Sequence, residues 1–355
     1  MNGRARLASV DALRGLTVAA MLLVNDPGDW GHVFAPLEHA QWNGVTPTDF
    51  ILPFFLFVVG VSIALSVGPR VDAGSDASTL RRTVLTRALR IVVLGLLLHA
   101  AAYWLMDTRA FRPLGVLQRI GICFAAAGLL AIGTRARTQW IVFVGILLGY
   151  WALLVWGGPL TKEGNLASRI DTALLGRFAY EFDAATGRGH EPEGLLSTLG
   201  AIATTLLGLR AGDWLRRAQV RRMWMTGAVL LVLGWLWGGV LPLNKQLWSS
   251  SYVLWTGGWA MLALALAHRA VDRLGAPAIG RSFGVNAVAV YAGAWLMTCV
   301  VEGLHWMGPL YNHGFAWMTP TTGPYVTSLV FALAFVALWW GVAVALDRHR
   351  LYFKI

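Results

Sequence analysis

The chain has 355 residues, of which 57% are hydrophobic and only 13% charged, and it contains 18 tryptophans. Too few polar residues are present to cover a water-soluble globule of this size, so the sequence predicts an integral membrane protein. The net charge is +11, and most of the basic residues lie in the loops between apolar segments. That distribution favours contact with membrane lipids and gives little support for nucleic-acid binding.

Ten apolar segments follow one another along the chain, each long enough to cross about 30 Å of hydrocarbon as a helix. Lone strands would leave backbone groups unpaired in lipid, so helices are the expected form. We predict an all-α bundle of about ten transmembrane helices that forms a single domain over residues 1–355, with a long hydrophilic loop at 157–194. The spans lie near residues 12–25, 48–68, 85–106, 114–132, 138–156, 195–211, 223–241, 250–268, 283–302 and 324–346.

Most of the 29 lysines and arginines fall in alternate loops between these spans. By the positive-inside rule, both termini then face the cytoplasm, and the loop after the first span and segment 157–194 face the other side. The first span has no small-residue cleavage site, so we expect it to be retained in a multi-pass membrane protein, whose far side is the periplasm or, in a eukaryote, a lumen. Cys123 and Cys299 lie within predicted spans, which argues against a disulfide and against a cysteine metal site.

The first span ends in Asn25 and Asp26, on the outer side. An asparagine there could donate a hydrogen bond to an oxyanion during acyl transfer, or it could simply cap the helix. Both interpretations stay open. Asp26 is a candidate substrate-binding residue.

The following loop places an imidazole, an amide and a carboxylate between two apolar spans, at His39, Asn43 and Asp49. Unpaired polar groups beside hydrocarbon cost several kcal/mol, which suggests that they act on a substrate. His39 could accept a proton from an amine or hydroxyl, or carry an acyl group, or it could be an interfacial histidine satisfied by backbone. Asp49 could orient that imidazole, but capping of the helix that begins near Phe50 is favoured.

Arg119 is the most conspicuous intramembrane charge, and Gln118 precedes it. A guanidinium at that depth needs a carboxylate, phosphate or carbonyl partner from another helix. It is either a structural ion pair or an anion clamp for a cofactor or substrate.

Amides, a cation and an indole gather after the seventh span, at Asn244, Lys245 and Trp248. Together with Trp42 they resemble a sugar-binding surface, although interfacial Trp and Lys are also ordinary membrane anchors. Asn286, early in the ninth span, either joins helices or lines a pocket. Glycine pairs within spans are better explained by close helix packing than by phosphate binding: Gly145 and Gly149, and Gly234 and Gly238.

Several of these residues recur in an order that resembles the transmembrane heparan-alpha-glucosaminide N-acetyltransferase family, in a bacterial-type form without a luminal domain. The resemblance extends over almost the whole chain. The matching pieces are Asp11-Ala-Leu-Arg-Gly15, Val24-Asn25, His39-Ala-Gln-Trp-Asn-Gly44 through Asp49, Gly115-Val-Leu-Gln-Arg-Ile-Gly121, Ile170-Asp-Thr-Ala-Leu-Leu-Gly176, Pro192-Glu-Gly-Leu-Leu196, Leu241-Pro-Leu-Asn-Lys-Gln-Leu-Trp-Ser249, Gly284-Val-Asn286 and Phe353-Lys-Ile355.

The resemblance implies that cytosolic acetyl-CoA donates its acetyl group to the amine of a terminal glucosamine on the far side of the membrane. It makes His39 the catalytic histidine and Asn25 its companion at the acetyl group, and it places Arg119 and Asn286 along the cofactor path. It also makes a homodimer a fair expectation. The chain departs from the family by beginning at the first family span, which removes heparan sulfate as an expected substrate. The segment between Asn25 and His39 is also a few residues longer.

The residues themselves fit this chemistry without a metal. A basic cytoplasmic rim would attract the nucleotide end of acetyl-CoA through Arg81, Arg82, Arg87, Arg90 and Lys354. An amino-sugar or peptidoglycan-fragment transporter, and an O-acyltransferase acting on a glycan or lipid, are the alternatives.

Overall fold

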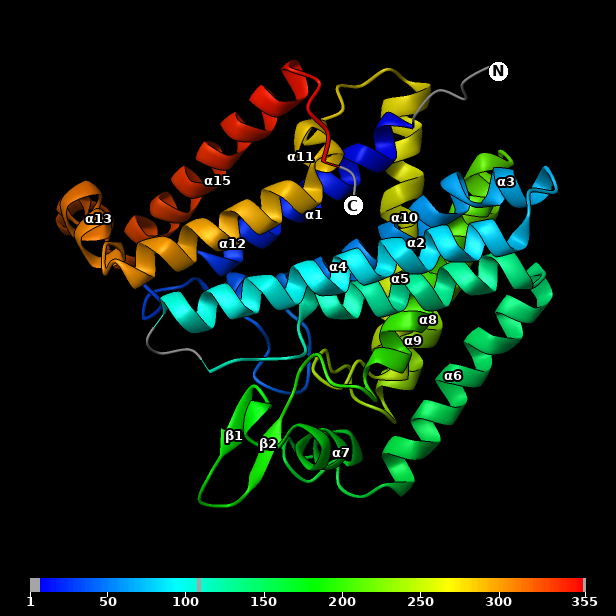
Figure 1. Ribbon diagram of the computed structural model, residues 1–355, viewed down its shortest axis with the longest axis horizontal. Coiled ribbons are helices and arrows are strands. Elements are labelled where there is room, and N and C mark those ends of the chain that lie inside the picture. The colour runs from blue at the N-terminus through cyan, green and yellow to red at the C-terminus, as the bar shows by residue number, and fades with distance from the viewer. Residues whose placement is uncertain (1–6, 107–109, 354–355) are drawn as a thin grey trace.

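The computed structural model describes residues 7–106 and 110–353. A long helix forms at each of the ten predicted apolar segments (Figure 1). These helices are α1 (Ala8–Asn25), α2 (Ile51–Ser66), α4 (Ala77–Leu105), α5 (Val116–Gly133), α6 (Ala136–Trp156), α8 (Thr198–Arg216), α9 (Val220–Gly238), α10 (Ser250–Ala267), α12 (Ala287–Gly303) and α15 (Pro324–Arg348). The shorter ones that the text uses are η2 (Pro47–Phe50), η3 (Gly176–Phe178), α3 (Gly68–Asp72), α7 (Leu166–Leu175), α11 (Arg281–Val285) and α13 (Met307–Gly314).

Fewer than ten of these helices are apolar enough to cross a membrane by themselves. In the described residues seven pass that test, or eight if Ala287–Gly303 and Met307–Thr322, which meet at a bend of 92°, form one broken span. The chain is therefore a multi-pass, mostly helical protein whose span count is lower than ten by composition. α8 falls short because it carries Arg210, Asp213 and several threonines, yet most of its side chains are buried against neighbouring helices. A central helix shielded from lipid does not need an apolar surface.

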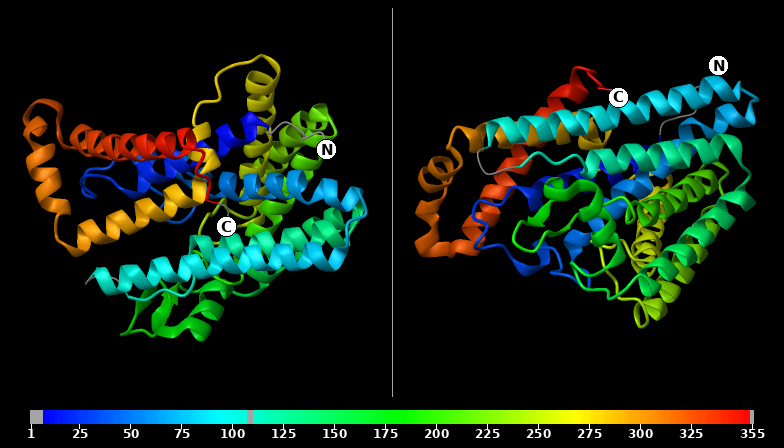
Figure 2. Two further views of the ribbon diagram at one scale, coloured as in Figure 1. Left: turned by 45° about the horizontal axis from the view of Figure 1, so that its top comes forward. Right: turned by 60° about the horizontal axis from the view of Figure 1, so that its bottom comes forward.

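The helices α2 and α8 approach each other closely at two glycines. A Cβ atom at Gly60 would lie 2.0 Å from the carbonyl oxygen of Thr205, and one at Gly208 would lie 1.9 Å from that of Phe57. Only hydrogen atoms fit at these points, so the two backbones touch. The α4–α5 pair runs side by side next to this centre (Figure 2).

The packing role predicted for glycines inside the spans is only partly right. A Cβ at Gly234 would lie 2.6 Å from the backbone nitrogen of Trp255, which confirms close packing of α9 on α10. Gly238 has ordinary space around it, with its nearest neighbour, a Leu243 side-chain atom, 3.6 Å from the added Cβ. The prediction is wrong for Gly145 and Gly149, because an added Cβ meets nothing within 4 Å on that face of α6.

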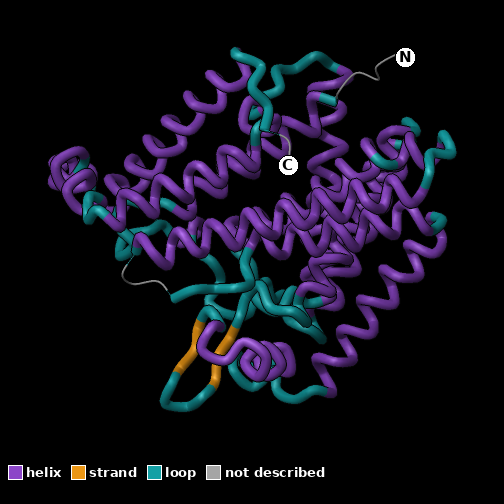
Figure 3. Tube along the Cα trace, viewed as in Figure 1, coloured by secondary structure: helices purple, strands orange, loops and turns teal. Residues whose placement is uncertain are grey.

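The hydrophilic segment 157–194 is structured. It contains α7 and an antiparallel hairpin of β1 (Glu181–Asp183) and β2 (Arg188–His190), in which Glu181 pairs with His190. This unit gathers with the loops after α1 and α9 at one side of the molecule, while the start of α1 and the end of α15 lie toward the other side (Figures 1 and 3). The start of α1 and the end of α15 therefore lie toward the same side of the molecule.

The α2–α8 crossing gives a stability prediction. Gly208→Ala should lower the melting temperature by several degrees, because a methyl group pressed onto a backbone carbonyl costs about 1–3 kcal/mol. Gly149→Ala is the matched control, since its site is open and alanine is the better helix former. Thermal unfolding in detergent measures both. Equal melting temperatures for the two variants would contradict the crossing.

Candidate functional site

Asp49 joins the first outer loop to the start of α2. Its side chain is 1% exposed, and its Oδ1 lies 2.7 Å from Nδ1 of His39. Its Oδ2 accepts the backbone N–H groups of Ala40 at 3.1 Å and Thr46 at 3.0 Å, and Thr46 and Asp49 form a capping box. Asp49 therefore contacts the imidazole, as one interpretation held. The predicted N-cap position is wrong, because Thr46 is the N-cap of η2 and Asp49 is the N3 residue of its capping box.

The contact with Asp49 orients the imidazole ring of His39 and favours a proton on Nδ1. Its side chain is 49% exposed, so the ring is accessible from outside the protein. A proton on Nδ1 that is donated to the carboxylate leaves the lone pair on Nε2. The pair is thus arranged as a base with its orienting acid.

Lys245 completes this cluster from the loop between α9 and α10. Its Nζ lies 3.0 Å from Nδ1 and 3.1 Å from Nε2 of His39, and 3.7 Å from Oδ1 of Asp49. Burial lowers the pKa of Lys245, while the carboxylates of Asp49 and Glu193 oppose that effect. The preceding residue, Asn244, donates to the side-chain oxygen of Asn43 at 3.2 Å. The structure thus brings together His39, Asn43, Asp49, Asn244 and Lys245 from two distant segments.

The two tryptophans proposed for sugar binding lie in different surroundings. Trp42 is half-buried in the loop between α1 and α2. Its indole N–H donates to the carbonyl oxygen of Leu160 at 2.8 Å, and its ring contacts His190 edge-on. Trp248 is fully buried, and its indole N–H donates to Thr204 at 3.0 Å. The structure therefore corrects the sequence prediction for Trp248, because no face of its ring is open to a sugar.

Arg119 makes several structural contacts with neighbouring segments. Its side chain is buried, and one terminal nitrogen donates to the carbonyl oxygens of Pro192 at 2.9 Å and Gly194 at 3.2 Å and to the hydroxyl of Ser197. Its guanidinium also lies over the Trp248 ring, 5.1 Å from the centroid. Arg119, which lies in α5, therefore holds the end of the hydrophilic segment 157–194 (the outer segment) against the helices by hydrogen bonds. Gln118, equally buried, packs against Gly95 and Gly115.

A second group of charges lies in the outer segment, and the sequence analysis did not identify it. Arg112 forms ion pairs with both Glu191 and Glu193 and lies over the Tyr180 ring. Burial alone would raise the pKa of Glu193, but the positive charges of Arg112, Arg119 and Lys245 lower it to about 2. The sequence around Glu191 and Glu193 did not indicate these ion pairs, because their partner Arg112 lies about 80 residues earlier in the chain.

Asn25 and Asp26 line a small cavity that no residue of the His39 cluster lines. Asn25 ends α1, and both residues line a space of about 60 Å³ with Trp295 of α12. Burial raises the pKa of Asp26 to about 6, while the hydroxyl of Thr298, which donates to Asp26 at 2.7 Å, opposes the rise. The pairing of Asn25 with His39 that the resemblance implies is not formed here.

The predicted cofactor residues do not form one group. Asn286 is buried at the start of α12, and its side-chain oxygen accepts the backbone N–H of Phe353 at 3.2 Å. Arg90 is exposed on α4, and Lys354 lies outside the described residues. Within the part of the chain that is described, no three His, Cys, Asp or Glu residues gather as a metal site.

A cavity of about 440 Å³ lies among α1, α2 and α8, near their ends opposite the outer loops. Arg14 lines it and donates to Ser62 at 2.7 Å and to Asp11 at 3.1 Å. Arg216 of α8 lines the same cavity and pairs with Asp72 at 2.5 Å. The sequence analysis gave Arg14 no binding role, although it lies in the motif Asp11-Ala-Leu-Arg-Gly15.

Comparison with known proteins gives one consistent result. The family model for the catalytic region of heparan-alpha-glucosaminide N-acetyltransferase matches residues 6–167, a range that includes His39, Asp49 and Arg119. Two curated relatives, the heparan-alpha-glucosaminide N-acetyltransferases of Mus musculus and Homo sapiens, are each 27% identical to the chain. Each alignment covers 99% of this chain and 60% of the relative, so the chain spans about 60% of the relatives' length.

The contacts of Arg119 predict what its loss does. Arg119→Gln should lower the melting temperature, because each buried carbonyl left without its donor costs about 1–3 kcal/mol. Arg119→Lys should restore little, since an ammonium cannot reproduce the planar fork. Arg137→Gln, at an exposed arginine of α6, is the control. An unchanged melting temperature combined with lost acetyl-CoA affinity would identify Arg119 as a cofactor clamp instead.

Proposed function

Because the chain belongs to the heparan-alpha-glucosaminide N-acetyltransferase family, we propose that it transfers the acetyl group of acetyl-CoA to the amine of a glucosamine-type sugar. The relatives are named N-acetyltransferases, which supports both the enzyme class and the donor. The observation that carries the proposal is the His39–Asp49 pair, in which a half-exposed imidazole is held by a buried carboxylate.

In the proposed reaction, Nε2 of His39 accepts a proton as the sugar amine attacks the thioester carbon. The new C–N bond forms, the C–S bond breaks, and the proton passes to the departing thiolate of CoA. Asp49 stabilises the imidazolium that exists between these steps. Transfer through an acetyl-histidine is the second route open to this pair.

The developing oxyanion needs a donor, and Lys245 is the cation that supports this role best. Its ammonium lies beside the imidazole, whereas Asn25 lies in a separate cavity. A positive charge held beside the reacting carbonyl stabilises the oxyanion as it develops. We propose that Lys245 takes the part that the sequence assigned to Asn25.

The nucleotide end of acetyl-CoA is proposed to enter at the opposite end of the helices. The cavity beside Arg14 and Arg216 offers two guanidinium groups, which suit phosphate oxygens. The charge pattern supports assigning this end to the cytoplasm and the His39 cluster to the outer side of a bacterial inner membrane. The acetyl group would then pass along the protein while the nucleotide stays on the cytoplasmic side. A homodimer is the oligomeric state that we propose from the family.

Replacing His39 tests the proposed base. His39→Ala should lower kcat for acetyl transfer to glucosamine by a factor on the order of 10²–10⁴, which is the usual worth of general-base catalysis. His32→Ala is a matched control, because His32 lies in the same loop, is 42% exposed and pairs with Asp29 at 2.7 Å. Equal activities of the two variants, measured with radiolabelled acetyl-CoA, would rule out His39 as the base.

A further inference from the structure

The side chain of Lys245 carries a primary amine, which is the chemical group that the proposed reaction acetylates. Its Nζ lies 3.0 Å from Nδ1 and 3.1 Å from Nε2 of His39. The amine of an acceptor must come equally close to Nε2, because a base takes a proton from a group within hydrogen-bond reach. Lys245 therefore already lies where the reacting amine of the sugar has to lie.

The loop of Lys245 is joined to the loop of His39 by contacts on either side of the lysine. Asn244, just before Lys245, donates to the side-chain oxygen of Asn43 at 3.2 Å. The backbone N–H of Gly44 donates to the carbonyl oxygen of Leu243 at 2.8 Å. The amine and the imidazole are thus held together before any ligand binds, and reacting groups that are already in place need little reorganisation.

The surroundings of Lys245 favour the neutral amine more than water does. Its side chain is only 18% exposed. Burial lowers the pKa of Lys245, the carboxylates of Asp49 and Glu193 oppose this effect, and the charge of Arg119 adds to it. A neutral amine has the lone pair that attacks a thioester carbon. The charged form that stabilises the oxyanion and the neutral form that can attack are two protonation states of one group.

We propose that Lys245 is a site of self-acetylation, which receives the acetyl group of acetyl-CoA when no acceptor sugar is bound. Nε2 of His39 accepts a proton from the Lys245 amine as Nζ attacks the thioester carbon. The C–N bond of an amide forms, the C–S bond breaks, and the proton passes to the departing thiolate of CoA. An acetyl group carried by His39 would give the same product.

The inference rests on the proposed function and adds to it a modification of the protein itself. Acetylation replaces the ammonium of Lys245 by a neutral amide, so the modified protein loses the charge that stabilises the oxyanion. A bound acceptor protects Lys245, because the sugar amine then takes its place beside His39. Acetyl-CoA alone should therefore inactivate the protein with time, and the acceptor should slow this inactivation.

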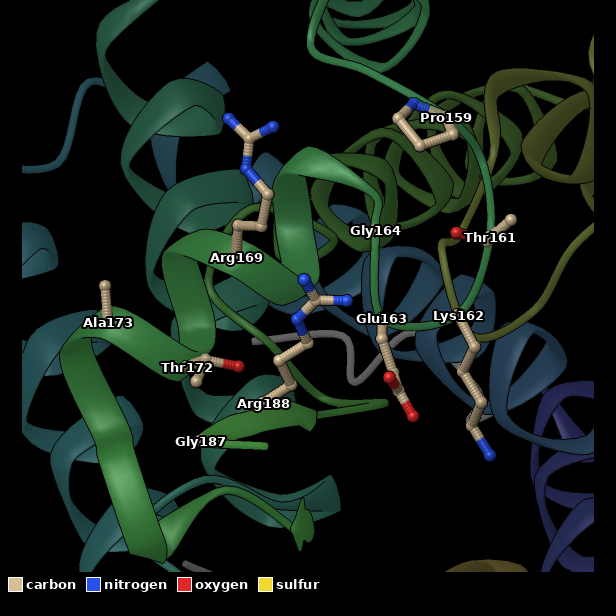
Figure 4. Close-up of a pocket in the computed structure, with 10 residues that line it drawn as sticks. All are labelled: Pro159, Thr161, Lys162, Glu163, Gly164, Arg169, Thr172, Ala173, Gly187 and Arg188. Atoms are coloured by element: carbon tan, nitrogen blue, oxygen red, sulfur yellow. The ribbon is translucent and has the colours of Figure 1, made fainter. Parts of the chain in front are cut away.

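The chain supplies a matched internal control for this modification. It contains only two other lysines, Lys162 and Lys354. Lys162 lines a cavity of the outer segment whose lining includes neither His39 nor Lys245 (Figure 4). Its side chain is 39% exposed and pairs with Glu181 at 2.5 Å. Uncatalysed acetylation should therefore modify Lys162 at least as fast as the more buried Lys245.

Peptide mass spectrometry tests the inference on the full chain in detergent, incubated with deuterium-labelled acetyl-CoA and no sugar. We expect the label to accumulate at Lys245 well before Lys162. His39→Ala should slow labelling of Lys245 by a factor on the order of 10²–10⁴, the usual worth of general-base catalysis, and leave Lys162 unchanged. His32→Ala should keep the labelling of Lys245, and added glucosamine should slow it.

Loss of activity during the same incubation gives a second measurement. The unmodified protein should lose acetyl transfer to glucosamine in step with the labelling of Lys245. Lys245→Arg, whatever its starting rate, should keep that rate throughout the incubation, because a guanidinium is not acetylated under these conditions. Inactivation of Lys245→Arg at the speed of the unmodified protein would contradict the inference.

The outcomes separate this inference from the proposed function. Equal labelling of Lys245 and Lys162, or labelling of Lys245 that is unchanged in His39→Ala, overturns the inference, because uncatalysed reaction would then explain it. So does the absence of label at Lys245 in protein that acetylates glucosamine, which leaves the proposed function intact. Label at Lys245 that depends on His39, without acetylated glucosamine, keeps the inference and refutes glucosamine as the acceptor. Absence of both products refutes both.

Discussion

The proposed site depends on the buried carboxylate of Asp49. One of its oxygens contacts His39, and the other accepts two backbone N–H groups that shape the loop before α2. A buried carboxylate is costly unless its oxygens are paired, so the loop must close around it. The backbone carbonyl of the same residue accepts the hydroxyl of Tyr252, which ties the turn to α10. One residue thus sets the start of a helix, the position of the imidazole and the docking of the loop that carries it.

Other buried polar groups near this site are also paired. Arg119 supplies donors to carbonyls of the segment before α8, and Arg112 neutralises Glu191 and Glu193 beside it. Glu193 and Asp49 in turn provide the negative charges around Lys245. The segments that meet here are far apart in the chain, and these ion pairs join them beside a small apolar cluster of Tyr150, Leu154, Ala167 and Leu247. Removing one partner would leave a buried charge without compensation, which is more costly than losing the pair.

The sequence predicted local features well and long-range contacts poorly. Runs of apolar residues located ten long helices, although only seven, or eight with the bent pair, are apolar enough to be membrane spans among the described residues. The sequence offered Asp49 as a partner of His39 in the same loop, but it favoured helix capping for that residue. Lys245, 206 positions from His39, reaches it only through tertiary folding, and no local pattern gives that contact. Trp248 was misjudged for a similar reason, because its burial depends on α5 and α8.

In the proposed function, acetyl transfer joins a donor on one face of the membrane to an acceptor on the other. Sealed vesicles containing the purified protein, with glucosamine enclosed and radiolabelled acetyl-CoA added outside, test this most directly. The account predicts labelled N-acetylglucosamine inside the vesicles, and none in vesicles without protein. Product that forms only when donor and sugar share a compartment would contradict it.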